Sequence, residues 1–537
     1  MRRIILRVLS LGLCAGALVL AAACARAPEG RDSLRVRLRH EPATLDPALA
    51  NDVTSTGVLG PIFDSLVRTD PETLEIRPDL ASSWEISDDG LVYTFHLREG
   101  ARFHHGRPVD AQDVVFSLTR LADPERPTPA AEILEPVIGS AAFREGRETG
   151  IEGLETPDDK TVRLRLEHPY APLLARLSAV SASIVPRDIY NDPDEKYLRN
   201  PVGSGPYRFA EWRAAQWLRL ESFEDYPGGA PAIPRLEFRV ITDLPAALAE
   251  FRRGELDILD ELPAGALRDA PEEFGDQLQL WPILATTHII MNLAAPPLAG
   301  NPQLRRAINL AVNRKHLCEV IMEGTPQPAS GILPPGMPGF DPQRPPLQED
   351  LDEARRLLAE AGYANGDGLP PLVLLFNANP RIQQLVEQVQ IDLARIGVRL
   401  ELRTGDQAAF LEALSSGSWG GRTVHLVRLG WNADYPDPDA FLGTQLLSRN
   451  AGLAGNFSRY SDPEVDALIE EARTSLDERH RMELYRKIER LAVDRDACWL
   501  FLYFHRDEVL VSRRVRGLRP LVTGDTTIPF EKLSLDD

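Results

Sequence analysis

Hydrophobic residues follow two different periods along this chain, and each period predicts one kind of element. Residues 91–98 read LVYTFHLR, with an apolar side chain at every second position, which predicts a β-strand. After Asp110, the apolar residues Val114, Leu118 and Leu121 recur at helical spacing instead. Asp110 is a good N-cap for that helix, because its carboxylate can accept free N–H groups of the first turn. Strands and helices therefore mix along the chain.

A longer unit, in residues 381–403, combines both periods. Its first part is a predicted helix with one apolar face, formed by Leu385, Val389, Leu393 and Ile396. Gly397 stops that helix, and the following VRLELR alternates as a strand does. Units of this kind build layered α/β folds with crossover connections.

Other segments extend the same pattern. Residues 352–363 and 462–476 are further predicted amphipathic helices, and the Pro- and Gly-rich segment 334–346 predicts an ordered surface loop. The length of 537 residues exceeds one ordinary domain and suggests two or three.

The N-terminus has the features of an export signal. Arg2, Arg3 and Arg7 precede a short apolar stretch over 8–20, which small residues and Cys24 follow. Small residues ending in Cys are similar to a bacterial lipobox, although Ala21 stands where Leu is usual. We expect 1–23 to be a cleaved signal peptide and Cys24 to carry a lipid. A single N-terminal anchor helix is the alternative.

Composition narrows the classes of function. The formal charge is −20, and we expect no nucleic-acid partner, because binding to phosphates requires clustered Lys and Arg. Cys318 and Cys498 lie in apolar surroundings, and we expect buried free thiols there. No cysteine pair has metal-ligand spacing. No second stretch approaches the length of a membrane span.

No catalytic, metal or cofactor motif is present. The sequence lacks a GxSxG elbow, a phosphate-binding Walker loop, HExxH and GxGxxG. His104 and His105 are adjacent and would point apart on a strand, which makes them a poor metal pair. We therefore expect no catalysis, no cofactor and no metal, although catalytic groups can also converge from distant parts of a chain.

Several segments, in order, carry a resemblance to a known family. They are 41–52 (EPATLDPALAND), 62–70, 77–124, 200–212 (NPVGSGPYRFAEW), 308–317 and 430–441 (GWNADYPDPDAF). From about residue 34 to the C-terminus the chain resembles the family 5 extracellular solute-binding proteins of ABC importers. The resemblance implies an α/β fold, a two-lobed periplasmic-binding-protein-like clamp of type II with an extra inserted domain.

The resemblance also implies a division of the chain. Lobe I would be discontinuous and would comprise 34–63, 179–288 and 499–537. The inserted domain would be 64–178, and lobe II would be 289–498. The ligand would lie between the lobes, which close over it by a hinge. Residues 287–293 and 500–506 are the predicted hinge strands.

A peptide receptor of this family needs a carboxylate for the ligand amine. Family receptors for peptides have an Asp three residues after the Trp of a Gly-Trp pair, and Asp434 matches that position after Gly430 and Trp431. The alternative is that Asp434 caps the turn that follows it. Asp437 is a second candidate with a stronger turn-forming context.

Three more side chains are candidate ligand contacts. Trp431 could wall the cleft, or it could be a core aromatic. Arg428 stands three before it, where some oligopeptide receptors have an Arg that reaches the ligand carboxylate; a structural Arg is the alternative. Arg381, at the start of a predicted helix, could face the cleft. Gly203, with its neighbours Ser204 and Gly205, is expected to form a structural turn.

The resemblance implies an exported receptor, periplasmic or at the cell surface and lipid-anchored through Cys24. It would capture peptides, with a tilt toward oligopeptides, and deliver them as a monomer to ABC permease subunits. A nickel chelate, haem, an opine or a sugar is the nearest alternative ligand. An exported peptide-binding chaperone or hydrolase is the alternative from another class.

Overall fold

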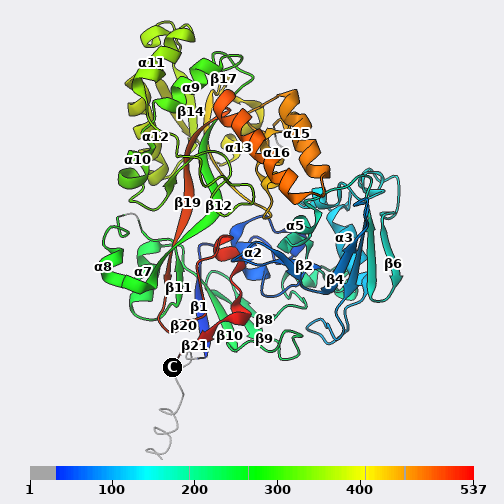
Figure 1. Cartoon of the computed structure of the whole chain (residues 1–537). Helices are drawn as coiled ribbons and strands as arrows, with labels where there is room; N and C mark the ends of the chain where they lie inside the picture. The colour runs from blue at the N-terminus through cyan, green and yellow to red at the C-terminus, as the bar shows by residue number, and fades with distance from the viewer. Residues whose placement is uncertain (1–31, 193, 264, 406, 453–454, 537) are drawn as a thin grey trace, which may run out of the picture.

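The computed structural model describes residues 32–192, 194–263, 265–405, 407–452 and 455–536. The predicted signal peptide and Cys24 lie outside the described residues. The described chain forms two lobes that share one large sheet, with a third unit beside them (Figure 1). No helix in this part of the chain combines the length and apolar character that a bilayer span requires.

In the described residues the main sheet has eleven strands, in the order β15-β14-β18-β12-β19-β11-β1-β10-β9-β8, with β13 paired to β19. Their bounds are β1 Ser33–Leu38, β8 Tyr207–Arg213, β9 Trp217–Ser222, β10 Arg235–Val240, β11 Ile258–Asp260, β12 Leu278–Met291, β13 Gln327–Pro328, β14 Leu372–Asn377, β15 Leu400–Gly405, β18 Leu426–Asn432 and β19 Trp499–Val511. We call the β11-to-β8 part lobe I and the β15-to-β18 part lobe II. The two long strands β12 and β19 run through both lobes (Figure 1).

The ladder between β12 and β19 is interrupted where it passes from one lobe to the other. Pro282 pairs with Arg506, and the next pair is Thr286 with Phe504, so three residues of β12 face only His505. Such a bulge bends a strand and breaks its pairing. This crossing point lies just before the predicted hinge segment 287–293 and at the end of 500–506.

The third unit is an antiparallel sheet covered by a helix. Its strands are β4 Ala81–Ile86, β5 Val92–Leu97, β7 Thr161–Arg165 and β6 Leu154–Asp158, and its helices are α3 Ala111–Leu121, α4 Ser140–Arg144 and α5 Leu173–Leu177. The predicted strand and helix are both confirmed. Asp110 accepts the N–H of Gln112 and Asp113, and Asp113 completes a capping box.

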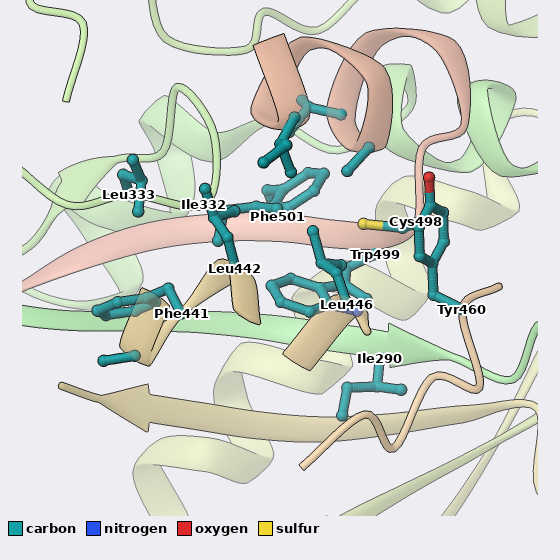
Figure 2. Packing of buried hydrophobic residues seen from close by; sticks show 14 of the residues in the cluster. Ile290, Ile332, Leu333, Phe441, Leu442, Leu446, Tyr460, Cys498, Trp499 and Phe501 are labelled. Carbon is teal, nitrogen blue, oxygen red and sulfur yellow. The ribbon is translucent and has the colours of Figure 1, made fainter. Parts of the chain in front are cut away.

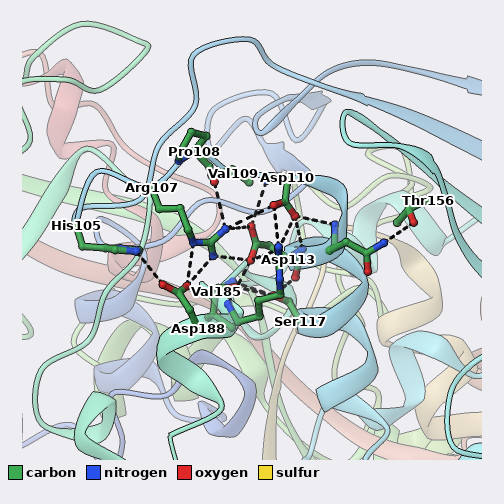
Figure 3. Close-up of polar contacts among 12 residues, drawn as sticks. His105, Arg107, Pro108, Val109, Asp110, Asp113, Ser117, Thr156, Val185 and Asp188 are labelled. Atoms are coloured by element: carbon green, nitrogen blue, oxygen red, sulfur yellow. Dashed lines mark hydrogen bonds and ion pairs between the residues drawn. The ribbon is translucent and has the colours of Figure 1, made fainter.

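A polar network joins this inserted unit to lobe I (Figure 3). Arg107 donates to the buried Asp113 on α3 and to Asp188 on α6 (Arg187–Tyr190). Arg187 pairs with Asp110 and lies 2.9 Å from Asp113. Because a buried carboxylate needs charged and hydrogen-bonding partners, Asp113 ties the two units firmly together.

Helices cover both faces of the lobe II sheet. One face packs α9 Pro302–Leu310, α10 Arg314–His316, α11 Leu351–Glu360 and α12 Pro380–Ala394; the other packs α13 Gln407–Ser416, α14 Leu442–Leu446, α15 Pro463–Thr474 and α16 Glu478–Arg490. Figure 2 shows Ile290 of β12 and Trp499 and Phe501 of β19 against Phe441 and Leu446. Lobe I has its own core around β1 and β10, covered by α2 Val53–Leu59, and α7 Leu244–Arg252 and α8 Ala270–Phe274 pack against β11.

Most local predictions agree with the structure. The helices predicted over 352–363 and 462–476 are α11 and α15, and 334–346 is a loop. Gly397 has φ +88°, and a Cβ there would lie 2.0 Å from the Asn365 carbonyl oxygen. Cys318 and Cys498 are buried free thiols in two different cores. The residue boundaries of the domains stay a prediction.

Candidate ligand-binding site

Strand ends of both lobes meet at the candidate site. In lobe II, β14 and β18 run parallel, so their carboxyl ends lie at one edge of the sheet. In lobe I, β1 is parallel to β10 and β11, and its carboxyl end is Leu38. Ligands of open α/β sheets bind outside such carboxyl ends, because helix N-termini and loops converge there.

A cavity of about 220 Å³ lies between these edges. Lobe I contributes Arg39 and Glu261, each directly after a strand, and lobe II contributes Arg381 and Arg428. The crossing strand β19 contributes the run from Tyr503 to Glu508, apart from the buried Phe504. Residues of both lobes and of the hinge therefore face one space.

Two of the predicted ligand residues lie in this cavity. Arg428, on β18, donates to the Thr287 hydroxyl at 3.3 Å, and its Nε is buried without a hydrogen-bond partner among the described residues. Arg381 follows Asn379, the N-cap of α12, and it donates to Met322 O and to Glu508 at 3.4 and 3.5 Å.

His505 lines the same cavity and was not expected from the sequence. Its Nε2 lies 2.6 Å from the Thr287 hydroxyl. Burial, followed by the charges of Arg428 and Arg381, lowers the pKa of His505 to about 3. The imidazole is therefore neutral at physiological pH. Thr287 can then accept from Arg428 and donate its single proton to the His505 ring.

Asp434 lies apart from this cavity, after the end of β18. Its side chain is exposed, and no described residue donates a hydrogen bond to it. Even so, desolvation by the surrounding protein raises the pKa of the Asp434 carboxyl. The nearby charge of Arg176 acts in the opposite direction, and Glu132 raises the pKa further. An exposed carboxylate without a hydrogen-bonding partner, and with a partly desolvated charge, suits a cationic partner.

Asp437 has partners within the protein. Its carboxylate accepts two hydrogen bonds from Arg481, at 2.8 and 3.1 Å, and one from Asp439 N. The side chain is buried, and it caps a short 3-10 helix, Pro438–Ala440. This geometry favours a structural role for Asp437, as its turn-forming context suggested.

Trp431 lies on the opposite face of β18 from Arg428. Its indole N–H donates to Ala440 O at 2.9 Å, and the half-buried ring packs against the core of lobe II. The structure therefore does not bring Trp431 into the cavity that holds Arg428.

Sequence reasoning missed a buried charge cluster beside Asp434. The carboxylate of Asp439 accepts from Arg473 and Tyr435 of lobe II, and from Tyr170 and Arg176 of the inserted unit. Burial alone would raise the pKa of Asp439, but the charge and hydrogen bonds of Arg473 hold it below its usual value. No local pattern signals this cluster, because Tyr170 and Asp439 are 269 positions apart.

His104 and the glycine loop belong to one structural contact, whereas His105 lies 3.3 Å from Asp188. The His104 ring lies 3.0 Å from Gly205 O and accepts the N–H of Gly203 at 3.3 Å. A Cβ on Gly203 would lie 2.1 Å from Ile62 O. Residues 204–206 form a bend that packs closely on Ile62, which favours the expected structural role of this segment.

Comparisons with known proteins agree on one family. The model described as bacterial extracellular solute-binding proteins, family 5 Middle, matches residues 75–452. A Pseudomonas aeruginosa protein named "Probable di/tripeptide-binding protein 5" is 30% identical over 94% of this chain and 96% of its own length. "Heme-binding protein A" of Haemophilus influenzae is also 30% identical, over 89% of this chain and 88% of its own.

A solved structure has the same fold over nearly the whole chain. It is the periplasmic binding protein DppA of Helicobacter pylori in complex with the peptide STSA. The two chains are 28% identical, with a TM-score of 0.77, and the match covers 94% of this chain and 98% of the other. The α/β clamp fold is therefore confirmed.

Proposed function

Because the chain belongs to the family 5 bacterial extracellular solute-binding proteins, we propose that it captures peptides between its lobes and delivers them to an ABC importer. Two named relatives support peptides as the ligand class, the di/tripeptide-binding protein of Pseudomonas and the peptide complex from Helicobacter. The family model describes proteins that bind solutes, and on that ground we propose that this chain catalyses no reaction.

The observation that carries the proposal is the state of Asp434. A carboxylate with a raised pKa and no hydrogen-bonding partner in the described chain has the properties needed to hold a ligand amine. The ammonium group of a peptide N-terminus would restore the charge balance at this position. Asp437 lacks these properties, because Arg481 already pairs with it.

The far end of the ligand is assigned to the cavity. The Arg428 guanidinium, with its unpartnered Nε, is the proposed partner of the peptide carboxylate. Arg381 would contribute charge from the N-terminus of α12. The peptide backbone between these anchors would pair with main-chain groups, so that many side chains are accepted. Trp431 stays a proposed wall residue.

Closure would bring the lobes together on the ligand. In this proposal lobe I is 34–63, 179–288 and 499–537, the inserted domain is 64–178, and lobe II is 289–498. The β12–β19 bulge would be the hinge. The closed form is what permease subunits would recognise. Export follows from the family, and a signal peptide over 1–23, a lipid on Cys24 and a monomeric state complete the proposal.

Calorimetry with matched peptides tests the ligand class. Tri-alanine is expected to bind, whereas N-acetyl-tri-alanine is expected to bind at least about tenfold more weakly, because it lacks the ammonium group. Equal affinity for both peptides would refute the amine site. Mass spectrometry of recovered peptide checks for cleavage, which would instead indicate a hydrolase. A stoichiometric haem complex without peptide binding would favour the ligand named for the Haemophilus relative.

A further inference from the structure

Two arginine side chains of the interlobe cavity have no acidic partner in the described chain. The Arg428 side chain donates only to the Thr287 hydroxyl, and the Arg506 side chain has no hydrogen bond or ion pair to a described residue. The Nε atoms of both side chains are buried without a partner. Buried N–H groups that are left unpaired destabilise a fold, and a ligand that accepts from them removes that penalty.

The remaining charges of the cavity are already paired. Arg39 pairs with Asp260, and Arg381 lies 3.5 Å from Glu508. Glu508 also accepts from Thr325 at 2.6 Å. No ion pair joins Glu508 to Arg428 or Arg506 in the described chain. Two other carboxylates line the cavity: Glu261 lies 4.0 Å from Arg37, and Asp507 also has an interaction within the protein. The neutral His505 adds no charge, so Arg428 and Arg506 are the two cations of the lining that have no acidic partner among the described residues.

The two guanidinium groups enter the cavity from well-separated backbone positions. Arg428 is opposite Ile289 of β12, which pairs with Leu500 of β19 on its other side. Arg506 comes six residues after Leu500 on β19. At about 3.3 Å per residue, roughly 20 Å of strand separates the two levels. A single carboxylate is small compared with this spacing, which favours two separate anion positions.

We propose that the cavity holds two carboxylates of one peptide, the terminal carboxylate on Arg428 and an acidic side chain near the C-terminus on Arg506. This deepens the proposed function and rests on it. The ligand class becomes short peptides with Glu or Asp at or next to the last position. Arg506 is the specificity-determining residue, because each guanidinium can take a carboxylate in a bidentate geometry.

Calorimetry with three peptides tests this assignment. Ala-Ala-Glu and Ala-Ala-Gln have similar shape and differ in one charge, and Ala-Ala-Ala reports the two termini alone. The wild type is expected to bind Ala-Ala-Glu at least about tenfold more tightly than Ala-Ala-Gln. Arg506→Gln is expected to remove that preference and to change the affinity for Ala-Ala-Ala by no more than about twofold.

Two further variants complete the design. Arg428→Gln is expected to weaken all three peptides together, because all share the terminal carboxylate. Arg513→Gln removes an exposed arginine of the same strand region, whose partner is Asp276, and is expected to leave every affinity unchanged. Circular dichroism melting checks that each variant is folded.

The outcomes separate the two proposals. Peptide binding without a preference for Glu over Gln would overturn the two-carboxylate assignment alone. An equal loss for all three peptides in Arg506→Gln would also overturn it, because Arg506 would then share the terminal carboxylate. A failure of the wild type to bind any of the three peptides would overturn both this inference and the proposed function.

Discussion

At the scale of single residues, the surroundings of an aspartate decide its role, since the same type of side chain does different things in different places. Asp434, Asp437 and Asp439 lie within six positions of each other. Asp437 and Asp439 are buried and paired with arginines, whereas Asp434 is exposed and has no hydrogen bond in the described chain. Only Asp434 therefore keeps a charge that a ligand can use.

Removing the Asp434 carboxylate should abolish most of the amine recognition. Asp434→Ala is expected to weaken the binding of free-amine peptides by about 2–5 kcal/mol, the range for truncating one partner of a buried hydrogen-bonded charge pair, because the bound peptide would cover Asp434. Titration calorimetry measures the change. Asp352→Ala removes a fully exposed carboxylate of α11 and serves as the control. Affinity equal to that of the wild type in Asp434→Ala would show that the amine lies elsewhere.

The raised pKa of Asp434 makes peptide affinity sensitive to acid. The ligand amine needs the ionised carboxylate, and this group becomes protonated at a higher pH than an ordinary aspartate, whose pKa is about 3.9. We expect the dissociation constant of tri-alanine to rise as the pH falls from 7 toward 4. In Asp434→Asn this dependence should be lost, and a titration series at fixed ionic strength compares the two proteins.

Only some residues of the candidate binding site could be predicted from the sequence. Asp434 and Arg428 are found by their spacing from Trp431, which a single stretch of chain contains. The partner of Asp437 is Arg481, 44 positions away, and Arg506 shares a cavity with Arg428 only because β12 lies between their strands. Contacts between distant segments leave no local pattern.

At the scale of elements, the Asp439 cluster bridges the inserted domain and lobe II. The ion pair with Arg473 lies within lobe II, whereas the hydrogen bond from Tyr170, at 3.2 Å, crosses between the units. Figure 3 shows the much denser network that fastens the inserted domain to lobe I through Arg107 and Asp113. When the lobes separate, the inserted domain should stay with lobe I, and the contacts to Asp439 should break.

Removing one crossing hydrogen bond should weaken the closed form. Tyr170→Phe is expected to lower peptide affinity by about 1 kcal/mol, mainly through faster dissociation, because the hydroxyl donates to a buried carboxylate. Stopped-flow dissociation rates measure this effect. Tyr226→Phe removes a hydroxyl that donates to Asp64, away from lobe II, and should leave the rate unchanged. Equal rates in both variants and the wild type would argue against a bridging role.

A pair of buried carboxylates at the junction of lobe I and the inserted domain makes the stability of the fold depend on pH. Burial raises the pKa of Asp64 well above its usual value and that of Asp79 to about 6, and the nearby charge of Asp79 raises the pKa of Asp64 further. The folded protein therefore holds protons that the unfolded chain releases near pH 4, so this pair destabilises the fold progressively as the pH rises.

The amide side chain in Asp64→Asn cannot ionise, so this variant should lose less stability than the wild type as the pH rises. We expect the melting temperature of the variant, relative to the wild type, to be higher at pH 8 than at pH 5. Scanning calorimetry at both pH values measures the difference. Asp352→Asn, at an exposed position, is the control and should show no such pH dependence. A variant that is less stable at pH 8 than at pH 5, relative to the wild type, would contradict the assignment.

Elements were the most predictable level of this structure. The strand over 91–98, the helix after Asp110 and the helix–glycine–strand unit around Gly397 are set by periodicity and by one cap or stop residue each. The bulge in β12 was not predictable, because it depends on the register of two strands from distant parts of the chain. The Pro- and Gly-rich loop 334–346 was correctly expected, although nothing local indicated that Met337 is buried in the lobe II core.

At the scale of the whole molecule, the lobes share β12 and β19, and most of each core lies within one lobe. The buried cluster around Leu34 and Trp281 lies in lobe I, and those around Ile290 and Leu426 lie mainly in lobe II. The Ile290 cluster also includes Leu74 of the inserted domain and packs against Val522 of lobe I, so opening the cleft would expose only a small part of either interior. The family resemblance predicted the two lobes and the two strands that cross between them, whereas composition alone indicated only the size and acidity of the protein.

The bulge between Pro282 and Thr286 is a suitable position for a fluorescent label that reports peptide binding. Ile283 is half-buried at the crossing point, and Cys318 and Cys498 are shielded from labelling reagents in the native protein. A dye that responds to solvent polarity, attached to an Ile283→Cys variant, should change its emission when peptide binds. The same dye on exposed Val320→Cys, within lobe II, should not respond. Because the signal would arise from bending of the two shared strands, it would report occupancy without any label touching the ligand.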